Sequence, residues 1–299
     1  MRTLVTGSTG LTGRALVSSL IAKDDEVVRL VRSKPLREYE VYWDPARGEI
    51  DRAGLEGLHR VVHLAGENIA AGRWTEQQKA RIRDSRVKGT RLLSEALAGL
   101  GSPPAVMVCA SAVGFYGDRG DEVMTEDSSP GSGFLAEVCR DWEAATEAAS
   151  RSGIRLTNLR IGMVLSFPGG ALEKMLPPFK MGLGGKIGSG EQYMSWIELS
   201  DLVAVISHAL SDSSLTGPVN AVSPGAVTNL EFTKTLGRVL GRPTVFPMPA
   251  FAARLAFGEM ADELILASTR AKPAKLLSSG FSFRFSDLED ALRVLLKKT

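Results

Sequence analysis

Three glycines near the start of the chain have the spacing of a phosphate-binding loop. They belong to the segment Thr6-Gly7-Ser8-Thr9-Gly10-Leu11-Thr12-Gly13, which lies between an apolar stretch and an amphipathic one. In a strand–loop–helix unit, the first glycine permits a tight turn, the second lets backbone approach a pyrophosphate, and the third lets helix and strand pack closely. Amide groups at the helix N-terminus then face the phosphates. The segment predicts a dinucleotide site, rather than an ordinary strand–helix turn, formed by Gly7, Thr9, Gly10, Leu11, Thr12 and Gly13.

The end of the second predicted strand indicates which dinucleotide this loop binds. An Asp or Glu about 20 residues beyond the glycines binds the ribose 2′-hydroxyl of NAD, whereas an Arg accommodates the 2′-phosphate of NADP. Arg32 and Ser33 occupy this place, followed by Lys34. The nearest acids are Glu26 and Glu38. Because a guanidinium binds phosphate with two hydrogen bonds, we expect NADP(H) rather than NAD(H); the alternative is a solvated basic turn.

These residues need a parallel sheet to position them. Apolar stretches predict strands at residues 4–5, 27–31, 39–43, 61–64, 106–110 and 156–161. Between them, helices are predicted at residues 14–22, 75–97 and 135–149. Strands that alternate with helices indicate parallel βαβ units, and right-handed crossovers build a doubly wound sheet from them. We therefore expect an α/β fold of the Rossmann type.

The chain changes character after residue 165. Residues 166–193 are rich in glycine and proline and show little periodicity. Helices are predicted at residues 201–211, 229–240, 251–268 and 286–298, the last with Ser286 as its N-cap. We expect residues 1–165 to form the dinucleotide-binding core and residues 166–299 to form a smaller C-terminal lobe on the substrate side of the sheet.

Composition and charge exclude several classes of protein. The 299 residues include 36 basic and 34 acidic side chains, a balance that argues against nucleic-acid binding. Cys109 and Cys139 are the only cysteines, and the histidines are scattered, which predicts no disulfide framework, no metal site and a cytoplasmic location. No apolar run approaches the roughly 20 residues that span a bilayer, and the start of the chain shows no signal peptide. We expect no nucleic-acid or membrane partner.

A series of short motifs carries a resemblance to a known family. After the glycines come His63-Leu64-Ala65-Gly66, Val87-Lys88-Gly89-Thr90-Arg91, Ser111-Ala112-Val113-Gly114-Phe115-Tyr116-Gly117 and Trp196-Ile197-Glu198-Leu199-Ser200-Asp201. In this order they resemble the extended, epimerase-like branch of the short-chain dehydrogenase/reductase superfamily. Narrower motifs are Glu67-Asn68-Ile69, Arg73-Trp74, Ser85-Arg86, Trp142-Glu143, Gly188-Ser189-Gly190 and Gly280-Phe281-Ser282-Phe283. These resemble an atypical, NAD-dependent epimerase/dehydratase-like subgroup called epimerase family proteins, which has a C-terminal segment of unknown function; some members carry a cell-division-inhibitor label.

The resemblance implies cofactor contacts beyond the glycine loop. The residues implied are Leu64, Ala65, Gly66, Arg86, Arg160 and Val164. Glu67 and Asn68 either line the pocket beside the nicotinamide or form a capped turn. Trp74 and Trp142 are expected to be packing residues, and His63 a hydrogen-bonded core residue.

The resemblance also implies a departure from the superfamily's chemistry. Its members use Ser, Tyr and Lys, with the Tyr four residues before the Lys, to exchange a proton with the substrate oxygen. None of the four tyrosines here has a Lys four residues later. Alignment on the Trp-Glu motif places Leu135 and Cys139 at these positions. Ser111 and Tyr116 remain as candidate catalytic residues, with slow, substrate-specific turnover expected; the alternative is that both only brace their loop.

Two functions are consistent with these features. The first is an NADP(H)-dependent reductase or epimerase that acts on a carbonyl or sugar carbon of an unassigned small-molecule substrate. The second is a non-catalytic NADP(H)-binding regulator or redox sensor that acts through protein partners, with a link to cell division that rests on the family label.

Overall fold

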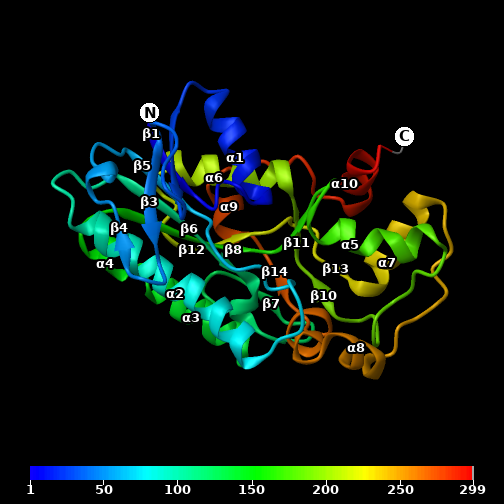
Figure 1. The fold of residues 1–299 in the computed structure, drawn as a ribbon. Coiled ribbons are helices and arrows are strands. Elements are labelled where there is room, and N and C mark those ends of the chain that lie inside the picture. Colours follow the sequence, from blue (N-terminus) through cyan, green and yellow to red (C-terminus); the bar gives the residue numbers. More distant parts are fainter. Residues whose placement is uncertain (298–299) are drawn as a thin grey trace. The chain divides into compact units, whose positions relative to one another are not determined.

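The protein is built around an eight-stranded sheet (Figure 1). The computed structural model describes residues 1–297. In sheet order the strands are β12 (Gly217–Ala221), β8 (Arg155–Ile161), β6 (Val106–Ala112), β5 (Arg60–His63), β1 (Arg2–Thr6), β2 (Glu26–Val31), β3 (Glu40–Asp44) and β4 (Glu49–Ile50). Strand β1 pairs parallel with β2 and β5, β5 with β6, and β2 with β3, whereas β4 pairs antiparallel at the edge. The predicted α/β fold of the Rossmann type is confirmed.

The strand order reverses beside β1. From β1 the chain continues through β2 and β3 on one side, whereas β5, β6 and β8 follow one another on the other side. In open α/β sheets, ligands bind outside the carboxyl ends of the strands at such a reversal. The glycine loop after β1, Arg32 after β2, residues 64–66 after β5, and Ser111 at the end of β6 all lie at carboxyl ends of these strands.

The central strands are buried on both faces, as parallel strands in this fold class are. Leu4 and Val5 of β1 and Val61 and Val62 of β5 have no exposed surface. The helices connecting the strands are α1 (Leu11–Ile21), α2 (Glu76–Ala98), α3 (Phe134–Ala144), α4 (Glu147–Arg151) and α6 (Leu199–Ser211). In the part of the chain that the structure describes, no helix has the length and apolar character needed to cross a membrane.

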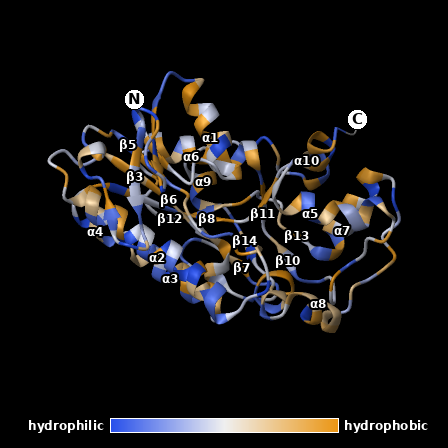
Figure 2. Cartoon of the chain, in the orientation of Figure 1, coloured by the Kyte–Doolittle hydropathy of each residue, from blue (hydrophilic) through white to orange (hydrophobic). Residues whose placement is uncertain are grey.

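Helix α2 carries paired charges. Lys88 Nζ lies 2.7 Å from Asp84 Oδ2, and Arg83 Nη2 lies 2.8 Å from Asp141 Oδ2. Figure 2 shows much of this helix in blue, the colour of hydrophilic residues. Arg83 and Lys88 of α2 therefore lie on a solvated face with acidic neighbours.

The single helix predicted at residues 135–149 is two helices, α3 and α4. The Thr146 hydroxyl donates to the Glu143 carbonyl at 2.5 Å, and the Thr146 amide donates to the same carbonyl at 3.2 Å. Threonine side chains that bond to a preceding carbonyl compete with the helical ladder. This competition accounts for the break after Ala144, which periodicity alone did not reveal.

The remaining elements are short and lie mostly in the second half of the chain. The strands are β7 (Val123–Met124), β9 (Met163–Leu165), β10 (Tyr193–Met194), β11 (Trp196–Glu198), β13 (Val227–Thr228) and β14 (Arg270–Ala271). The helices are α5 (Gly170–Lys180), α7 (Asn229–Leu240), α8 (Ala250–Phe257), α9 (Ala274–Ser278) and α10 (Leu288–Leu295). Tight 3₁₀ turns occur at Ala53–Leu55 and Val113–Tyr116, and a π-helical turn at Ala261–Ile265.

Two stretches in this half differ from the prediction. The glycine-rich stretch at residues 166–193 contains helix α5, whose buried side chains Leu172, Leu176 and Phe179 lie on one face. This apolar face keeps the segment helical although Pro177 and Pro178 supply no amide hydrogen. The helix predicted at residues 251–268 ends at Phe257, because Gly258 takes a positive φ of 63°.

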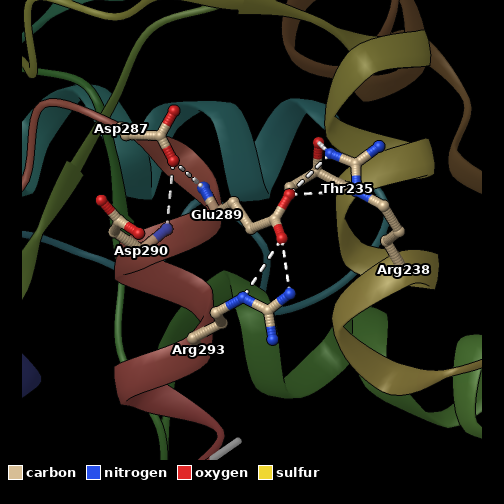
Figure 3. A network of polar contacts seen from close by, with 6 residues as sticks. All are labelled: Thr235, Arg238, Asp287, Glu289, Asp290 and Arg293. Carbon is tan, nitrogen blue, oxygen red and sulfur yellow. Dashed lines mark hydrogen bonds and ion pairs between the residues drawn. The ribbon is translucent and has the colours of Figure 1, made fainter. Parts of the chain in front are cut away.

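The last helix begins later than predicted, and Asp287 caps it in place of Ser286 (Figure 3). The Asp287 carboxylate accepts the amides of Glu289 at 2.8 Å and Asp290 at 3.1 Å. Glu289 in turn binds Arg238 of α7 at 2.7 Å and Arg293 at 2.6 Å. Hydrogen bonds from these two arginines hold the pKa of Glu289 below its ordinary value. Of the predicted range, Lys298 lies outside the described residues.

Helices α5, α7 and α10 share an apolar core in which Trp196 and Phe232 have no exposed surface. A buried carboxylate fixes the approach to α10. Asp201 accepts the amides of Arg284 and Phe285, both at 2.9 Å. The Asp of the Trp-Ile-Glu-Leu-Ser-Asp motif therefore fastens the Gly-Phe-Ser-Phe segment near the C-terminus.

Contacts group the described chain into two compact units that interleave along the sequence. The first comprises Met1–Ser111, Val138–Leu159 and Val203–Val219, and the second comprises Ala112–Glu137, Arg160–Leu202 and the chain from Asn220 onward. The first unit thus includes most of α6 and the start of β12, which lie beyond residue 165. The assignment of residues 1–165 to the dinucleotide-binding core and residues 166–299 to a smaller lobe stays a prediction.

The interleaving predicts that a fragment of residues 1–165 does not fold. It lacks Val205, Ile206 and Val219, which have no exposed surface within the first unit. Their loss exposes the apolar surface they cover. We expect the fragment to aggregate in size-exclusion chromatography and to show no cooperative thermal transition by circular dichroism. A monomeric fragment with a sharp transition contradicts this.

Candidate functional site

The glycine loop is shaped by two close backbone contacts. Gly7 has a φ of +65°, and a Cβ there would lie 2.7 Å from the carbonyl oxygen of Leu64. At Gly13, a Cβ would lie 2.1 Å from the carbonyl oxygen of Gly7. The first glycine therefore makes the turn against the end of β5, and the third lets α1 pack on that turn, as the spacing predicted.

The middle glycine faces open space. A Cβ at Gly10 would meet only the Gly7 carbonyl oxygen within 4 Å, at 3.3 Å, and Thr9 and Gly10 are exposed. Gly10 is also the N-cap of α1, with no side-chain cap and no acidic residue in the first turn. The first-turn amides of Leu11, Thr12 and Gly13 have no partner within the helix, and those of the half-buried Leu11 and Thr12 can face an anion, which the positive end of the helix favours.

The Thr6 hydroxyl joins the ends of β1 and β5. The amides of Leu64 and Ala65 both donate to Thr6 Oγ1 at 3.1 Å. Thr6 Oγ1 also lies 2.7 Å from Nδ1 of His63. This arrangement holds the Leu64–Ala65 backbone in the position against which Gly7 turns.

Counting hydrogens assigns the tautomer of His63. The two amides use both lone pairs of Thr6 Oγ1, so this hydroxyl must donate its hydrogen to Nδ1 of His63. Nε2 then carries the ring hydrogen and donates to Thr90 Oγ1 at 3.0 Å, which also accepts from Nε1 of Trp142 at 2.9 Å. Burial lowers the pKa of His63 to about 4. His63 is thus a neutral, hydrogen-bonded core residue and no base, as expected, and Trp142 is a packing residue.

The residues after β2 present positive charge to solvent. Arg32, Ser33 and Lys34 are all exposed. Within residues 1–297, the Arg32 guanidinium makes no hydrogen bond or ion pair. A cation without an acidic partner at this end of the sheet suits a phosphate group.

Ser85 and Arg86 of α2 support the turn after β5. The Glu67 amide donates to Ser85 Oγ at 3.0 Å, and Arg86 Nη1 donates to the Glu67 carbonyl at 3.1 Å. The guanidinium also packs on the ring of Trp142, 5.0 Å from its centroid. Burial lowers the pKa of Arg86, while Cys139 and Glu67 act in the opposite direction. Arg86 therefore holds the Gly66–Glu67 backbone in place by a hydrogen bond from its guanidinium.

The rest of this turn is held locally. Asn68 Oδ1 accepts the Ala70 amide at 2.9 Å, and Trp74 Nε1 donates to the Ile69 carbonyl at 2.8 Å. These bonds favour the capped turn over a pocket lining for Asn68, and packing for Trp74.

Ser111 has a partner that the sequence analysis did not select. Its hydroxyl donates to Oε1 of Glu143 at 2.7 Å, and Ser111 is only 3% exposed. Glu143 lies on α3, one turn beyond Cys139 and two turns beyond Leu135, so the three share a helix face. This spacing, readable from the sequence, was the signal that could have identified Glu143.

Tyr116 is placed as a structural residue. It has no exposed surface, and its hydroxyl lies 2.9 Å from the Thr125 carbonyl and 2.7 Å from Oδ1 of Asn220. Nη1 of Arg160 donates to the same hydroxyl at 3.0 Å. Burial raises the pKa of Tyr116, while Arg160 and Asn220 act to lower it. A phenol with these partners favours the bracing alternative over proton transfer.

Arg160 and Val164 are likewise part of the packing. The Arg160 guanidinium stacks 3.5 Å from the ring centroid of Phe115 and is 3% exposed. Val164 pairs with Ile197 in the short β9–β11 ladder. Their selection as cofactor-binding residues stays a prediction.

The described residues contain no group of three or more His, Cys, Asp or Glu side chains arranged to hold a metal ion. Cys109 and Cys139 are buried and not bonded to each other. What the first unit offers is a cradle of backbone amides, an open glycine face and an exposed arginine. This set fits the pyrophosphate and the 2′-phosphate of a dinucleotide.

Comparisons with known proteins agree with the inference of a dinucleotide-binding site. Residues 3–221 match the model of the NAD dependent epimerase/dehydratase family, and residues 248–295 match a domain of unknown function, DUF1731. The chain is 46% identical over 288 residues to an epimerase family protein of Mycobacterium bovis, covering 96% of this chain and 95% of that protein.

Two solved structures extend the comparison. The human epimerase family protein SDR39U1, crystallised with NADPH, has a TM-score of 0.91 and 34% identity, with both chains covered completely. A nucleoside-diphosphate sugar epimerase of Corynebacterium glutamicum has a TM-score of 0.81 and 40% identity, covering 99% of this chain and 58% of that one.

The open face of Gly10 predicts that Gly10→Val abolishes dinucleotide binding without unfolding the protein. The side chain fills the space above the helix N-terminus, and we expect the affinity to fall about 100-fold or more. Loss of the glycine cap costs about 1 kcal/mol of stability. Isothermal titration with NADPH and thermal melting measure the two effects. Gly72→Val is the control, because a Cβ at Gly72 meets nothing within 4 Å; undiminished binding by Gly10→Val refutes the assignment.

The bonds of Tyr116 predict that Tyr116→Phe lowers the free energy of unfolding by about 1–3 kcal/mol, since Asn220 Oδ1 and Arg160 lose a buried partner. We expect the dissociation constant of NADPH to stay within about threefold of the wild-type value, because the phenol hydroxyl is already engaged by Thr125, Asn220 and Arg160. Urea unfolding provides the measurement. Tyr39→Phe, at a 45% exposed tyrosine, should change stability by less than about 0.5 kcal/mol. Equal stability of Tyr116→Phe and wild type contradicts the bracing role.

Proposed function

The chain belongs to the NAD dependent epimerase/dehydratase family, and from that premise we propose that it binds NADP(H) and exchanges hydride with a small-molecule substrate as a reductase or epimerase. The amides at the start of α1 would hold the pyrophosphate, with Gly7 and Gly13 fixing the loop. Bound NADP(H) supplies the hydride chemistry. The protein's own residues would bind the dinucleotide, orient the substrate and exchange a proton with it.

The observation that carries the choice of NADP(H) is the exposed Arg32 at the end of β2. A carboxylate that could bind the ribose 2′-hydroxyl of NAD is absent from its two neighbours along the chain, Val31 and Ser33. Arg32, with Ser33 and Lys34 beside it, would receive the 2′-phosphate. The presence of NADPH in the crystal structure of the human relative supports this choice.

A second candidate is a non-catalytic NADP(H)-binding regulator that acts through protein partners. One argument for it comes from α3, where Leu135 and Cys139 stand in place of the tyrosine and lysine. The other comes from Tyr116, whose hydroxyl is hydrogen-bonded to Thr125 and Asn220. We propose a cytoplasmic location for either function, because both cysteines are free and buried. Consumption of bound NADPH, followed by its absorbance against a panel of carbonyl compounds, separates an enzyme from a sensor.

The wild-type protein is expected to bind NADPH several-fold more tightly than NADH, and Arg32→Asp to remove or reverse that preference. The new carboxylate repels the 2′-phosphate and accepts a hydrogen bond from the 2′-hydroxyl. Fluorescence titration with both nucleotides measures the ratio of dissociation constants.

Arg91→Asp is the matched control, because it makes the same change of charge at an exposed position of α2. We expect its preference to equal that of the wild type. Equal affinity of the wild-type protein for NADPH and NADH would sink the assignment of Arg32.

A further inference from the structure

The hydrogen bond between Ser111 and Glu143 fixes what Ser111 can do next. A carboxylate only accepts hydrogen bonds, so the 2.7 Å contact uses the single hydrogen of the serine hydroxyl. The lone pairs of Ser111 Oγ are then the part of this group left for another molecule. In this state Ser111 can accept a hydrogen bond from a substrate hydroxyl, but it has no hydrogen to donate to a carbonyl.

The surroundings of Glu143 identify it as the carboxylate that this face of α3 presents to the end of β6. Burial raises the pKa of the Cys109 thiol, and the negative charge of Glu143 raises it further, which places the carboxylate beside the end of β6. The preceding turns of the same helix face carry Cys139 and Leu135, which are 3% and 8% exposed. A carboxylate therefore lies behind the one serine hydroxyl at the carboxyl end of β6.

The position of the pair fits a role in chemistry. Ser111 lies at the carboxyl end of β6, the strand that pairs with β5. Strand β5 ends at the turn that packs against the glycine loop. Ser111 is thus on the ligand-binding edge of the sheet, beside the strand order reversal.

We propose that Ser111 is the catalytic residue that contacts a secondary hydroxyl of the substrate, and that Glu143 is the positioning residue behind it that receives the proton. This inference rests on the proposed function. It assigns the substrate class as a secondary alcohol, whose hydroxyl can donate to the lone pairs of Ser111 Oγ that the bond to Glu143 leaves available. Glu143 takes the place of the tyrosine–lysine pair that the chain lacks.

The proton balance is complete for oxidation of such an alcohol. The substrate O–H bond breaks and its proton passes to Ser111 Oγ, while the hydrogen of Ser111 passes to Oε1 of Glu143. The hydride of the same carbon leaves to the oxidised nicotinamide dinucleotide, and the carbonyl forms. Reduction runs the same transfers backwards from protonated Glu143, so an epimerase would use the pair in both directions. The protonated carboxyl exchanges its proton with water between turnovers.

A purely structural bond between β6 and α3 is the competing explanation, and a thiol at position 111 distinguishes the two without cofactor or substrate. The variant Ser111→Cys is treated with methyl methanethiosulfonate, and the modified cysteine is located by mass spectrometry. Ser111 and Cys139 are both 3% exposed and Cys109 is fully buried, so a purely structural role predicts labelling as slow as that of these two cysteines, which serve as internal references. A path by which substrate reaches Ser111 predicts that the new thiol reacts at least about 100-fold faster than either of them.

The labelling rate of this thiol also tests whether the Glu143 carboxylate acts on the group at position 111. An ionised carboxylate beside the thiol keeps it protonated, so adding Glu143→Gln should raise the labelling rate at pH 7 about tenfold. Adding Glu137→Gln, at an exposed site on the same helix, should leave the rate unchanged. Absence of labelling, or equal rates with and without Glu143→Gln, overturns the proposal.

Activity gives a second measure once a substrate turns over. Glu143→Gln keeps an oxygen that accepts the Ser111 hydrogen, but it takes no proton, so we expect kcat to fall about 100-fold with KM and NADPH affinity within about threefold. Unchanged kcat overturns the proposal. Because labelling uses the cofactor-free protein, failure of the proposed NADP(H) binding would appear only in the nucleotide titrations, and the two outcomes remain distinct.

Discussion

The contact between the turn at Gly7 and the backbone of Leu64 and Ala65 is the constraint on which the rest of the cofactor cradle depends. A Cβ at Gly7 would lie only 2.7 Å from the Leu64 carbonyl oxygen, and a Cβ at Gly13 only 2.1 Å from the Gly7 carbonyl oxygen. These distances leave no room for a side chain on either residue. Helix α1 can therefore begin directly beside the ends of β1 and β5, with its amides at the point where the strand order reverses.

A buried polar network keeps this contact in place. The Thr6 hydroxyl accepts two amides from the end of β5, and His63 and Thr90 continue the chain of hydrogen bonds to Trp142. Thr6 and His63 have their donors and acceptors matched, and satisfied buried polar groups of this kind rigidify a core. Because His63 is neutral with a pKa of about 4, the network keeps the same protonation throughout the physiological pH range.

The protein combines an ordinary dinucleotide fold with an unusual face on α3. Leu135 and Cys139 are buried and apolar in character, and Glu143 alone brings a charge to the serine at the end of β6. In the second unit, the hydroxyl of Tyr116 is taken up by Asn220, Thr125 and Arg160. A chemistry based on a carboxylate and a serine is therefore more consistent with the contacts than one based on a phenol. Asp201 accepts hydrogen bonds from two backbone amides of the segment before α10. These buried hydrogen bonds hold the C-terminal segment against the start of α6.

The sequence by itself determined the strand–helix alternation, the positions of the three glycines and the basic end of β2, because these depend on local periodicity and on the absence of a side chain at fixed spacings. It also identified Ser111 and the missing tyrosine–lysine pair. It did not determine where α3 breaks, that α5 is helical despite Pro177 and Pro178, or that the first unit draws on residues 203–219, since these depend on competing hydrogen bonds and on apolar faces covered by distant residues. Only the tertiary structure paired Ser111 with Glu143, 32 positions later in the chain, and enclosed Tyr116 and Arg160. The four-residue spacing of Leu135, Cys139 and Glu143 indicates a shared helix face, but only the folded chain brings that face against the end of β6, because such contacts join residues far apart in the sequence.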